Sequence, residues 1–387
     1  MVDRRADAAS PAPGLAPATT MAGAPVATAA PGARRLTRGN GAGWAFALPG
    51  FGLICAFIIL PFFFAFGLSL TNARLISPNV PEYVGFENYR NLLGMGLVTL
   101  EPVRDDAGNV VRDADGVIEY PRLRTITRSD EYPQYRGMRE LITWRSGENV
   151  RVLLASDVVF IRAIVNTVIF VVVVAPVQAG LALGLALLIN QPLRGINVFR
   201  AIYFMPVVVS IVVVSMLWRF LYDGDDGLLN SLFAWVTFGA FEGHDWLGDP
   251  STALGAIIVT SIWNGVGFHM VIWLAGLQTI SPTLYEAARI EGASKWQAFR
   301  YVTWPGLRNT AVLILIVITM QAFALFAQID VMTQGGPLDS TQTIVFQAVE
   351  RGYGRQDISG GSTISVVLFL IVLSISLAQR YVTRERT

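Results

Sequence analysis

The chain has 387 residues, of which 53% are hydrophobic and only 15% are charged. Soluble domains carry about a quarter of charged residues, and here the apolar residues stand in long blocks, so the composition predicts a polytopic membrane protein. The net charge of +1 gives no indication of a nucleic-acid partner, and a single cysteine, Cys55, excludes an intrachain disulfide framework and a cysteine-based zinc site.

The N-terminal segment, residues 1–42, consists mainly of Ala, Pro, Gly and Thr with a few Arg. Such a stretch cannot bury enough apolar surface to order itself, so we expect a disordered tail. An apolar block follows it. We assign residues 43–95 to the first transmembrane helix and the start of an external loop.

Residues 96–156 separate the first apolar block from the second. They contain the turn signals DDAGN and DADG, which lie between short β-like runs such as VIEY and LITW. This pattern predicts a small β-rich external insert. A polar loop without regular structure is the alternative.

Six apolar blocks are long enough to cross a hydrocarbon core of about 30 Å, which takes about 20 residues of helix. The blocks are 44–70, 160–188, 198–221, 253–277, 308–330 and 361–380. The expected fold class is therefore an all-α polytopic membrane protein with six transmembrane helices. Five of these helices belong to a core domain of residues 157–387.

Basic residues are concentrated in the segments that lie on one side of a six-span arrangement. They are Arg34, Arg35, Arg38, Arg194, Arg200, Arg289, Lys295, Arg300, Arg308, Arg380, Arg384 and Arg386. The loop after the third span instead reads DGDDG. By the positive-inside rule, we expect both termini on the cytoplasmic side.

Several kinds of chemistry are missing from the sequence. The only lysine, Lys295, follows GAS, so the chain has no GxxxxGK[ST] phosphate-binding loop. Two histidines without a cysteine pair predict no structural metal site. The acidic residues Asp157, Asp223 and Asp330 lie at or beyond the ends of spans, which weighs against an ion-coupled carrier. We therefore expect no enzymatic activity and no cofactor in this chain.

The segment 281–307, between the fourth and fifth spans, is charged and helical in pattern. It reads SPTLYEAARIEGASKWQAFRYVTWPGL. Ser281 and Pro282 are typical of a helix start, and Gly292 can adopt the left-handed conformation that stops a helix after Glu291. Ser294 can cap a second helix that ends near Pro305. An interfacial amphipathic helix without a partner is the alternative.

This segment resembles the EAA loop of importer-type ABC permeases. The matching residues are Glu286, Ala287, Ala288, Gly292, Val302 and Pro305, with Trp304 at a position where leucine is usual. Further stretches, including FENYRNLL, FRAIYFMPVVVSIVVVSMLWRFLY, SIWNGVGFHMVIWLAGLQ and VMTQGGP, look like the carbohydrate-importer branch with maltose-permease-type subunits. The resemblance covers about residues 45–95 and 157–385.

The resemblance implies the type I ABC importer permease fold and a subunit that imports a sugar, most simply a di- or oligosaccharide. In that family the loop is a coupling helix that docks on a separate ATPase subunit, so Glu286, Ala287, Ala288, Gly292 and Pro305 are expected to couple the two chains. ATP-Mg is bound by the ATPase dimer. The other implied partners are a second, related permease chain and an extracytoplasmic solute-binding protein. The implied location is a bacterial or archaeal cytoplasmic membrane.

The resemblance also points to a substrate path along the fourth and fifth spans. The matching positions are Gly265, Phe268, Ile318, Ala322 and Leu325. The last three lack polar groups, so neighbouring side chains are expected to supply stacking and hydrogen bonds. These neighbours are Trp263, Asn264, Thr319, Gln321 and Gln328, together with His269, the one ionisable residue well inside the fourth span.

Two alternatives remain for these observations. Each polar residue of the path could instead join helices to one another. The whole chain could also be an ion-coupled secondary carrier or a membrane scaffold. We find neither the mid-span acids nor the inverted repeat that are typical of such carriers.

Overall fold

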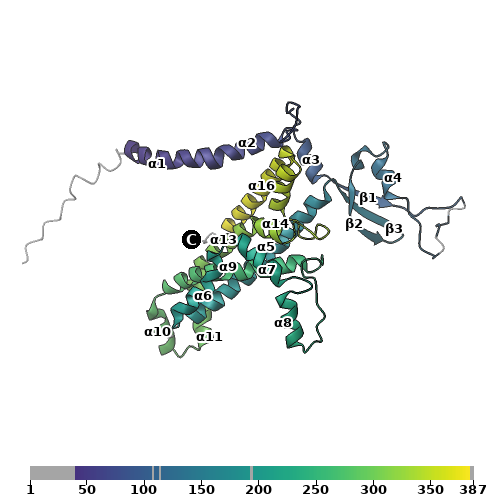
Figure 1. Ribbon diagram of the computed structural model, residues 1–387. Coiled ribbons are helices and arrows are strands. Elements are labelled where there is room, and N and C mark those ends of the chain that lie inside the picture. Colours follow the sequence, from purple (N-terminus) through teal and green to yellow (C-terminus); the bar gives the residue numbers. More distant parts are fainter. Residues whose placement is uncertain (1–39, 107–108, 113–114, 192–194, 384–387) are drawn as a thin grey trace, which may run out of the picture. The chain divides into compact units, whose positions relative to one another are not determined.

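The computed structural model describes residues 40–106, 109–112, 115–191 and 195–383 (Figure 1). The chain divides into a unit that ends at Ile59 and a larger unit that begins at Leu60. The smaller unit contains α1 (Asn40–Ile54) and a π-helical turn, Cys55–Ile59. The prediction of a disordered tail over residues 1–42 falls almost entirely outside the described residues.

Four helical segments of the described chain are long and apolar enough to cross a bilayer. They are Phe46–Ser69, which ends with α2 (Leu60–Ser69), Val158–Ile189 (α5), Ala253–Gln278 (α9) and Ile358–Gln379 within α16 (Ile358–Thr383). Two bent helix pairs raise the number to as many as six if each pair counts as one span. The helical membrane fold is thus confirmed, with four to six spans where six are expected.

The third expected span, 198–221, is not one helix. It consists of α6 (Ile196–Val208) and α7 (Ile211–Leu221), which meet at 96°. Val209 and Ser210 have ψ angles of 139° and 134°, so the helix stops there. The Pro206 carbonyl then accepts a hydrogen bond from Asn264 Nδ2 at 2.9 Å. An interrupted helix is tolerated in a membrane when a neighbour satisfies the freed backbone group in this way.

The helix in the fifth expected span, 308–330, is shorter than predicted. Its helix, α13 (Arg308–Phe323), ends at Phe323, and the short helix α14 (Ala327–Met332) follows after a break. Phe326 has φ −132° and ψ −62°, outside helical values, so α13 cannot continue through it. Between α14 and α16 the chain forms α15 (Ile344–Val349) and the π-helical turn Glu350–Gly354.

The insert contains a small antiparallel sheet, as predicted. Its strands are β1 (Met95–Leu100), β2 (Arg139–Ser146) and β3 (Asn149–Ala155), in the order β1-β3-β2. LITW lies in β2, whereas VIEY contributes only an isolated bridge between Ile118 and Arg112. The sequence did not indicate α4 (Leu123–Arg128), which packs with Leu123 and Ile126 on the buried strand residues Val98, Leu100, Val150, Val152 and Leu154.

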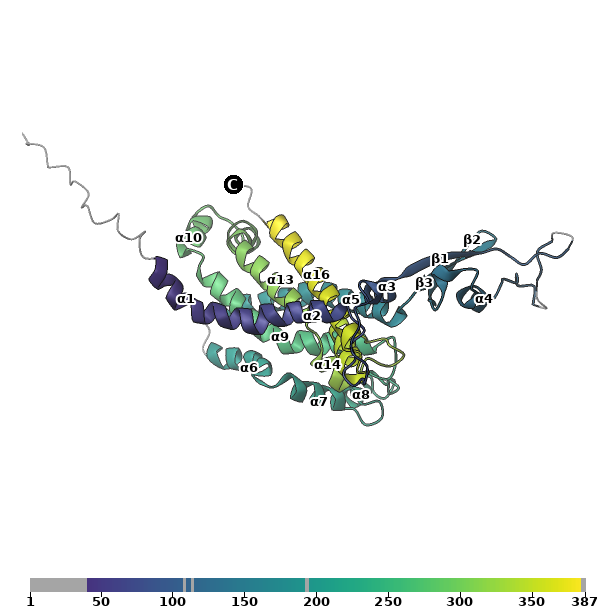
Figure 2. The same cartoon turned by 90° about the horizontal axis from the view of Figure 1, so that it is seen from above.

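The main core lies between α5, α9 and α13. It contains the fully buried Ala182 and Ala186 of α5, whose small side chains let the helices approach closely. The large side chains of Ile257 and Met270, from α9, are also fully buried in it. Figures 1 and 2 show the sheet and α10 (Pro282–Ile290) at opposite ends of the larger unit.

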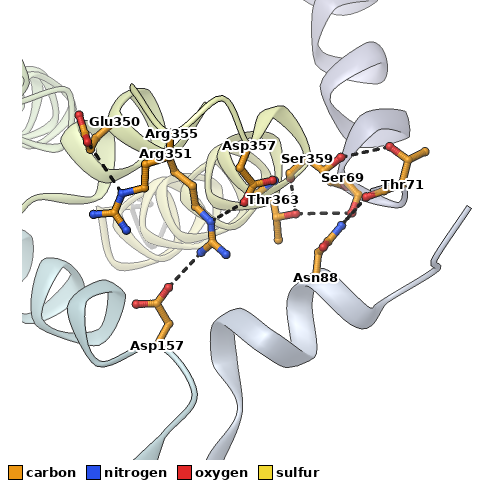
Figure 3. A network of polar contacts seen from close by, with 11 residues as sticks. Ser69, Thr71, Asn88, Asp157, Glu350, Arg351, Arg355, Asp357, Ser359 and Thr363 are labelled. Carbon is orange, nitrogen blue, oxygen red and sulfur yellow. Dashed lines mark hydrogen bonds and ion pairs between the residues drawn. The ribbon is translucent and has the colours of Figure 1, made fainter. Parts of the chain in front are cut away.

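A polar network joins the helix ends near the sheet (Figure 3). Arg351 donates to Asp157 Oδ2 at 3.0 Å and to Asp357 Oδ2 at 2.8 Å, and Asp157 also caps the start of α5. Asn88, from α3 (Glu87–Leu93), donates to the carbonyls of Ser69 and Thr71 at 2.8 and 2.7 Å. The network therefore ties the ends of α2, α3, α5 and α16 together at one end of the unit.

Candidate substrate cavity and coupling loop

A cavity of about 350 Å³ lies between α5, α9 and α13, next to the break between α6 and α7. Its polar lining residues are Gln178, Ser261, Asn264, His269, Gln321 and Gln328. Its apolar wall includes the aromatic rings of Phe170, Phe268 and Phe326. No charged residue is among the described residues that line it.

The structure brings nine of the eleven residues predicted for the substrate path to this cavity. These are Asn264, Gly265, Phe268, His269, Ile318, Gln321, Ala322, Leu325 and Gln328. Trp263 instead faces an apolar groove of α5 and α9 and packs against Trp218, with 5.5 Å between ring centroids. Thr319 accepts a hydrogen bond from Gln379 of α16 at 3.4 Å and lies away from the cavity.

His269 is fully buried in the cavity wall, and its two ring nitrogens differ in their surroundings. Nδ1 lies 2.8 Å from the Gly265 carbonyl oxygen and 3.0 Å from Gln178 Nε2. A Cβ atom at position 265 would displace the Gln178 amide from this position. Nε2 is buried without a partner among the described residues. The imidazole therefore keeps one hydrogen-bonding position that no described residue fills.

Sequence reasoning missed two polar residues of the cavity. Gln178 is 4% exposed and interrupts an otherwise apolar block in the second span. Ser261, on α9, donates a hydrogen bond to Oε1 of Gln328, on α14, at 2.7 Å. A lone glutamine within an apolar transmembrane block is a signal that could have indicated Gln178.

The segment 281–307 forms the helix–turn–helix that its sequence predicts. It contains α10, α11 (Lys295–Ala298), a π-helical turn (Phe299–Thr303) and α12 (Trp304–Gly306). Gly292 has φ +74°, as expected for the turn, and Ser294 forms a capping box with Gln297. Ser281 occupies the N-cap position, but its hydroxyl contacts Thr283 Oγ1 at 2.8 Å instead of capping a backbone amide.

The two arms of this loop are held together but leave much of their surface uncovered. Tyr285 Oη and Thr303 Oγ1 are 3.0 Å apart and join the arms. A cavity of about 450 Å³ between them is lined by Ala287, Ala288 and Glu291, among others, whereas Glu286 lies on the opposite side of α10. Pro305 is exposed. The large exposed apolar side chains of the loop are Leu284, Ile290, Trp296, Tyr301 and Trp304.

Comparison with known proteins places this architecture in a family. The family described as binding-protein-dependent transport system inner membrane component matches residues 160–386, more than half of the chain. The chain belongs to this family. It is thus a multi-pass permease of the ABC transporter class, as its sequence predicts.

Individual relatives agree with this assignment. The permease is 35% identical over 271 residues to the lactose transport system permease protein of Rhizobium radiobacter, an alignment that covers 69% of this chain and 89% of the relative. It is 35% identical over 220 residues to the trehalose/maltose transport system permease protein of Thermococcus litoralis, covering 57% and 73%.

A solved structure shows the same fold. A chain of a bacterial ABC transporter involved in the import of alginate aligns with a TM-score of 0.60 and 21% identity, covering 89% of this permease and 97% of that chain. At this identity the likeness concerns the fold alone.

Proposed function

We propose that this chain is a permease subunit of an ATP-driven importer for an uncharged di- or oligosaccharide. The observation that carries the proposal is the cavity of α5, α9 and α13, whose polar lining consists of amides, a hydroxyl and one imidazole. Such groups pair with sugar hydroxyls, and aromatic faces such as Phe268 and Phe326 pack against sugar rings. A phosphate ester or a uronate calls for positively charged partners.

The loop 281–307 is proposed to dock on a separate ATPase subunit that binds ATP-Mg. Its exposed apolar side chains and Glu286 support this role, because exposed apolar patches on a folded surface mark contact sites. Glu286, Ala287, Ala288, Gly292 and Pro305 are assigned to coupling. ATP binding then moves the loop, and the helices on either side carry the movement to the cavity.

The family suggests that the importer contains an ATPase dimer, a second permease chain and an extracytoplasmic solute-binding protein. From the distribution of basic residues, we assign both termini and the loop 281–307 to the cytoplasmic side and the insert 96–156 to the external side. Residues 157–387 form the transport core, and residues 43–95 supply the first span.

The test is ATPase activity of the complete reconstituted transporter with its binding protein, across neutral mono-, di- and oligosaccharides, a glycerol phosphate and an oligouronate. We expect stimulation by one class of neutral sugar. Stimulation by the phosphate or the uronate alone would contradict the proposed substrate while leaving the permease assignment intact. A chain that forms no complex with an ATPase subunit would contradict the coupling role.

A further inference from the structure

The segment that follows α7 has an unusual composition. Residues 227–241, GLLNSLFAWVTFGAF, contain no charged side chain, and they include α8 (Leu228–Val236). Acidic residues stand on both sides, with Asp225 and Asp226 before the segment and Glu242 after it. α8 is therefore a short apolar helix between two acidic segments.

One face of α8 is fully engaged with its own loop. Asn230 Nδ2 donates to the carbonyls of Gly224 and His244 at 2.9 and 3.0 Å, and its Oδ1 accepts from Trp246 Nε1 at 2.7 Å. The Phe233 ring lies 5.9 Å from that of Trp246. These contacts fix the rotation of α8 about its axis, so the opposite face of the helix points away from the loop.

That opposite face is apolar and uncovered in the described part of the chain. It carries Leu228, Leu232, Trp235 and Val236, and the Trp235 side chain is 77% exposed. Phe238, two residues after the end of α8 at Val236, is 98% exposed and has φ +55°. A bulky residue at positive φ is uncommon, and here it stands where α8 ends and the chain turns.

The uncovered face of α8 follows a helix that also has uncovered apolar side chains. α7 belongs to the broken third span and exposes Val213 near its start and Leu217 and Phe220 near its end. α8 begins at Leu228, shortly after α7 ends at Leu221. Figures 1 and 2 show both helices on the side of the unit away from α10. The chain belongs to a family of inner membrane components, and α7 is half of a candidate membrane span, so α8 begins close to the end of a membrane segment.

We propose that the outer face of α8 rests in the interfacial region of the bilayer and anchors the loop between α7 and α9. Tryptophan is enriched at the level of lipid headgroups, and an amphipathic helix of this kind lies in the plane of the interface. The segment lacks basic residues, so its binding does not depend on anionic lipids. The acidic residues on either side remain in water. The anchor holds the end of α7 in place.

Electron paramagnetic resonance of the complete transporter in phosphatidylcholine liposomes tests this placement. Nitroxide labels are attached to Leu232→Cys, Trp235→Cys and, as the water-exposed control, Asp226→Cys, each in a Cys55→Ser background that has no other cysteine. We expect the ratio of oxygen to nickel-chelate accessibility at 232 and 235 to exceed that at 226 roughly tenfold, because the interface excludes the chelate.

Two results would overturn the proposal. Nickel accessibility at 232 and 235 equal to that at 226 would place the face in water. Immobile labels that neither reagent reaches would show that a protein, such as the second permease or the binding protein, covers the face. The label at position 232 leaves Trp235 in place, so agreement between the two positions shows that the loss of Trp235 has not itself moved the helix. Complex formation with the ATPase confirms that each variant is folded.

Discussion

His269 is the residue whose chemistry bears most directly on the proposed substrate. Its Nε2 is buried in the cavity wall without a partner in the described chain. We expect His269→Leu to lower the initial rate of sugar uptake into proteoliposomes about tenfold, the effect of losing one buried hydrogen bond of about 1.4 kcal/mol. Thr319→Val is the matched control, because Thr319 faces α16 instead of the cavity. Equal uptake by both variants would argue against a substrate contact at His269.

The sequence could indicate which part of each span lines the cavity but not which face. Asn264 and Trp263 are adjacent, yet Asn264 lines the cavity and Trp263 faces an apolar groove. Successive residues lie about 100° apart around a helix, as its 3.6-residue turn requires. In a helix that is apolar all round, no periodicity marks the inner side. The same holds for Thr319, which lies outside the cavity.

At the scale of elements, the turn between α10 and α11 depends on one residue. Gly292 has φ +74°, and no atom lies within 4 Å of the position of an added Cβ. Gly292→Ala therefore introduces backbone strain without a collision, at a cost of about 1 kcal/mol. We expect hydrogen exchange over residues 282–298 to become about fivefold faster, as that free energy implies for local opening.

A second glycine provides the control for this change. Gly255 of α9 is exposed, helical and equally free of neighbours, so Gly255→Ala adds the same methyl group without left-handed strain. We expect unchanged or slower exchange in that variant, because alanine favours a helix over glycine. Faster exchange from Gly255→Ala, or none from Gly292→Ala, would contradict the account of the turn.

Local signals explain why the turn between α10 and α11 could be predicted and the break in the third span could not. Ser294, Gln297 and Gly292 carry their preferences within a few residues of the turn they form. The break after α6 instead depends on Asn264, which supplies a hydrogen bond to the Pro206 carbonyl from 58 positions away in sequence. Pro206 alone is compatible with a continuous transmembrane helix, so the sequence indicated one span where the structure has two helices.

At the scale of the molecule, the loop and the cavity are joined by the helices they share. α9 carries Ser261 and His269 and ends at Gln278, just before α10 begins at Pro282. α13 begins at Arg308, directly after the loop, and carries Ile318 and Ala322. A displacement of the loop as one body therefore acts on two walls of the cavity at once, as ATP-driven alternating access requires.

Glu286→Arg tests this connection in the complete transporter. Glu286 is exposed, lies outside the cavity of the loop, and has no ion-pair partner in the described chain. Reversal of its charge should leave membrane insertion intact and abolish the ATPase stimulation that sugar-loaded binding protein produces, because the docked surface then carries the wrong charge. Glu291→Arg makes the same charge change on the same loop, but Glu291 faces the cavity between α10 and α11. We expect this control to keep most of its stimulation. Full stimulation in Glu286→Arg would remove Glu286 from the coupling surface, and equal loss in both variants would show that the net charge of the loop matters instead of one contact.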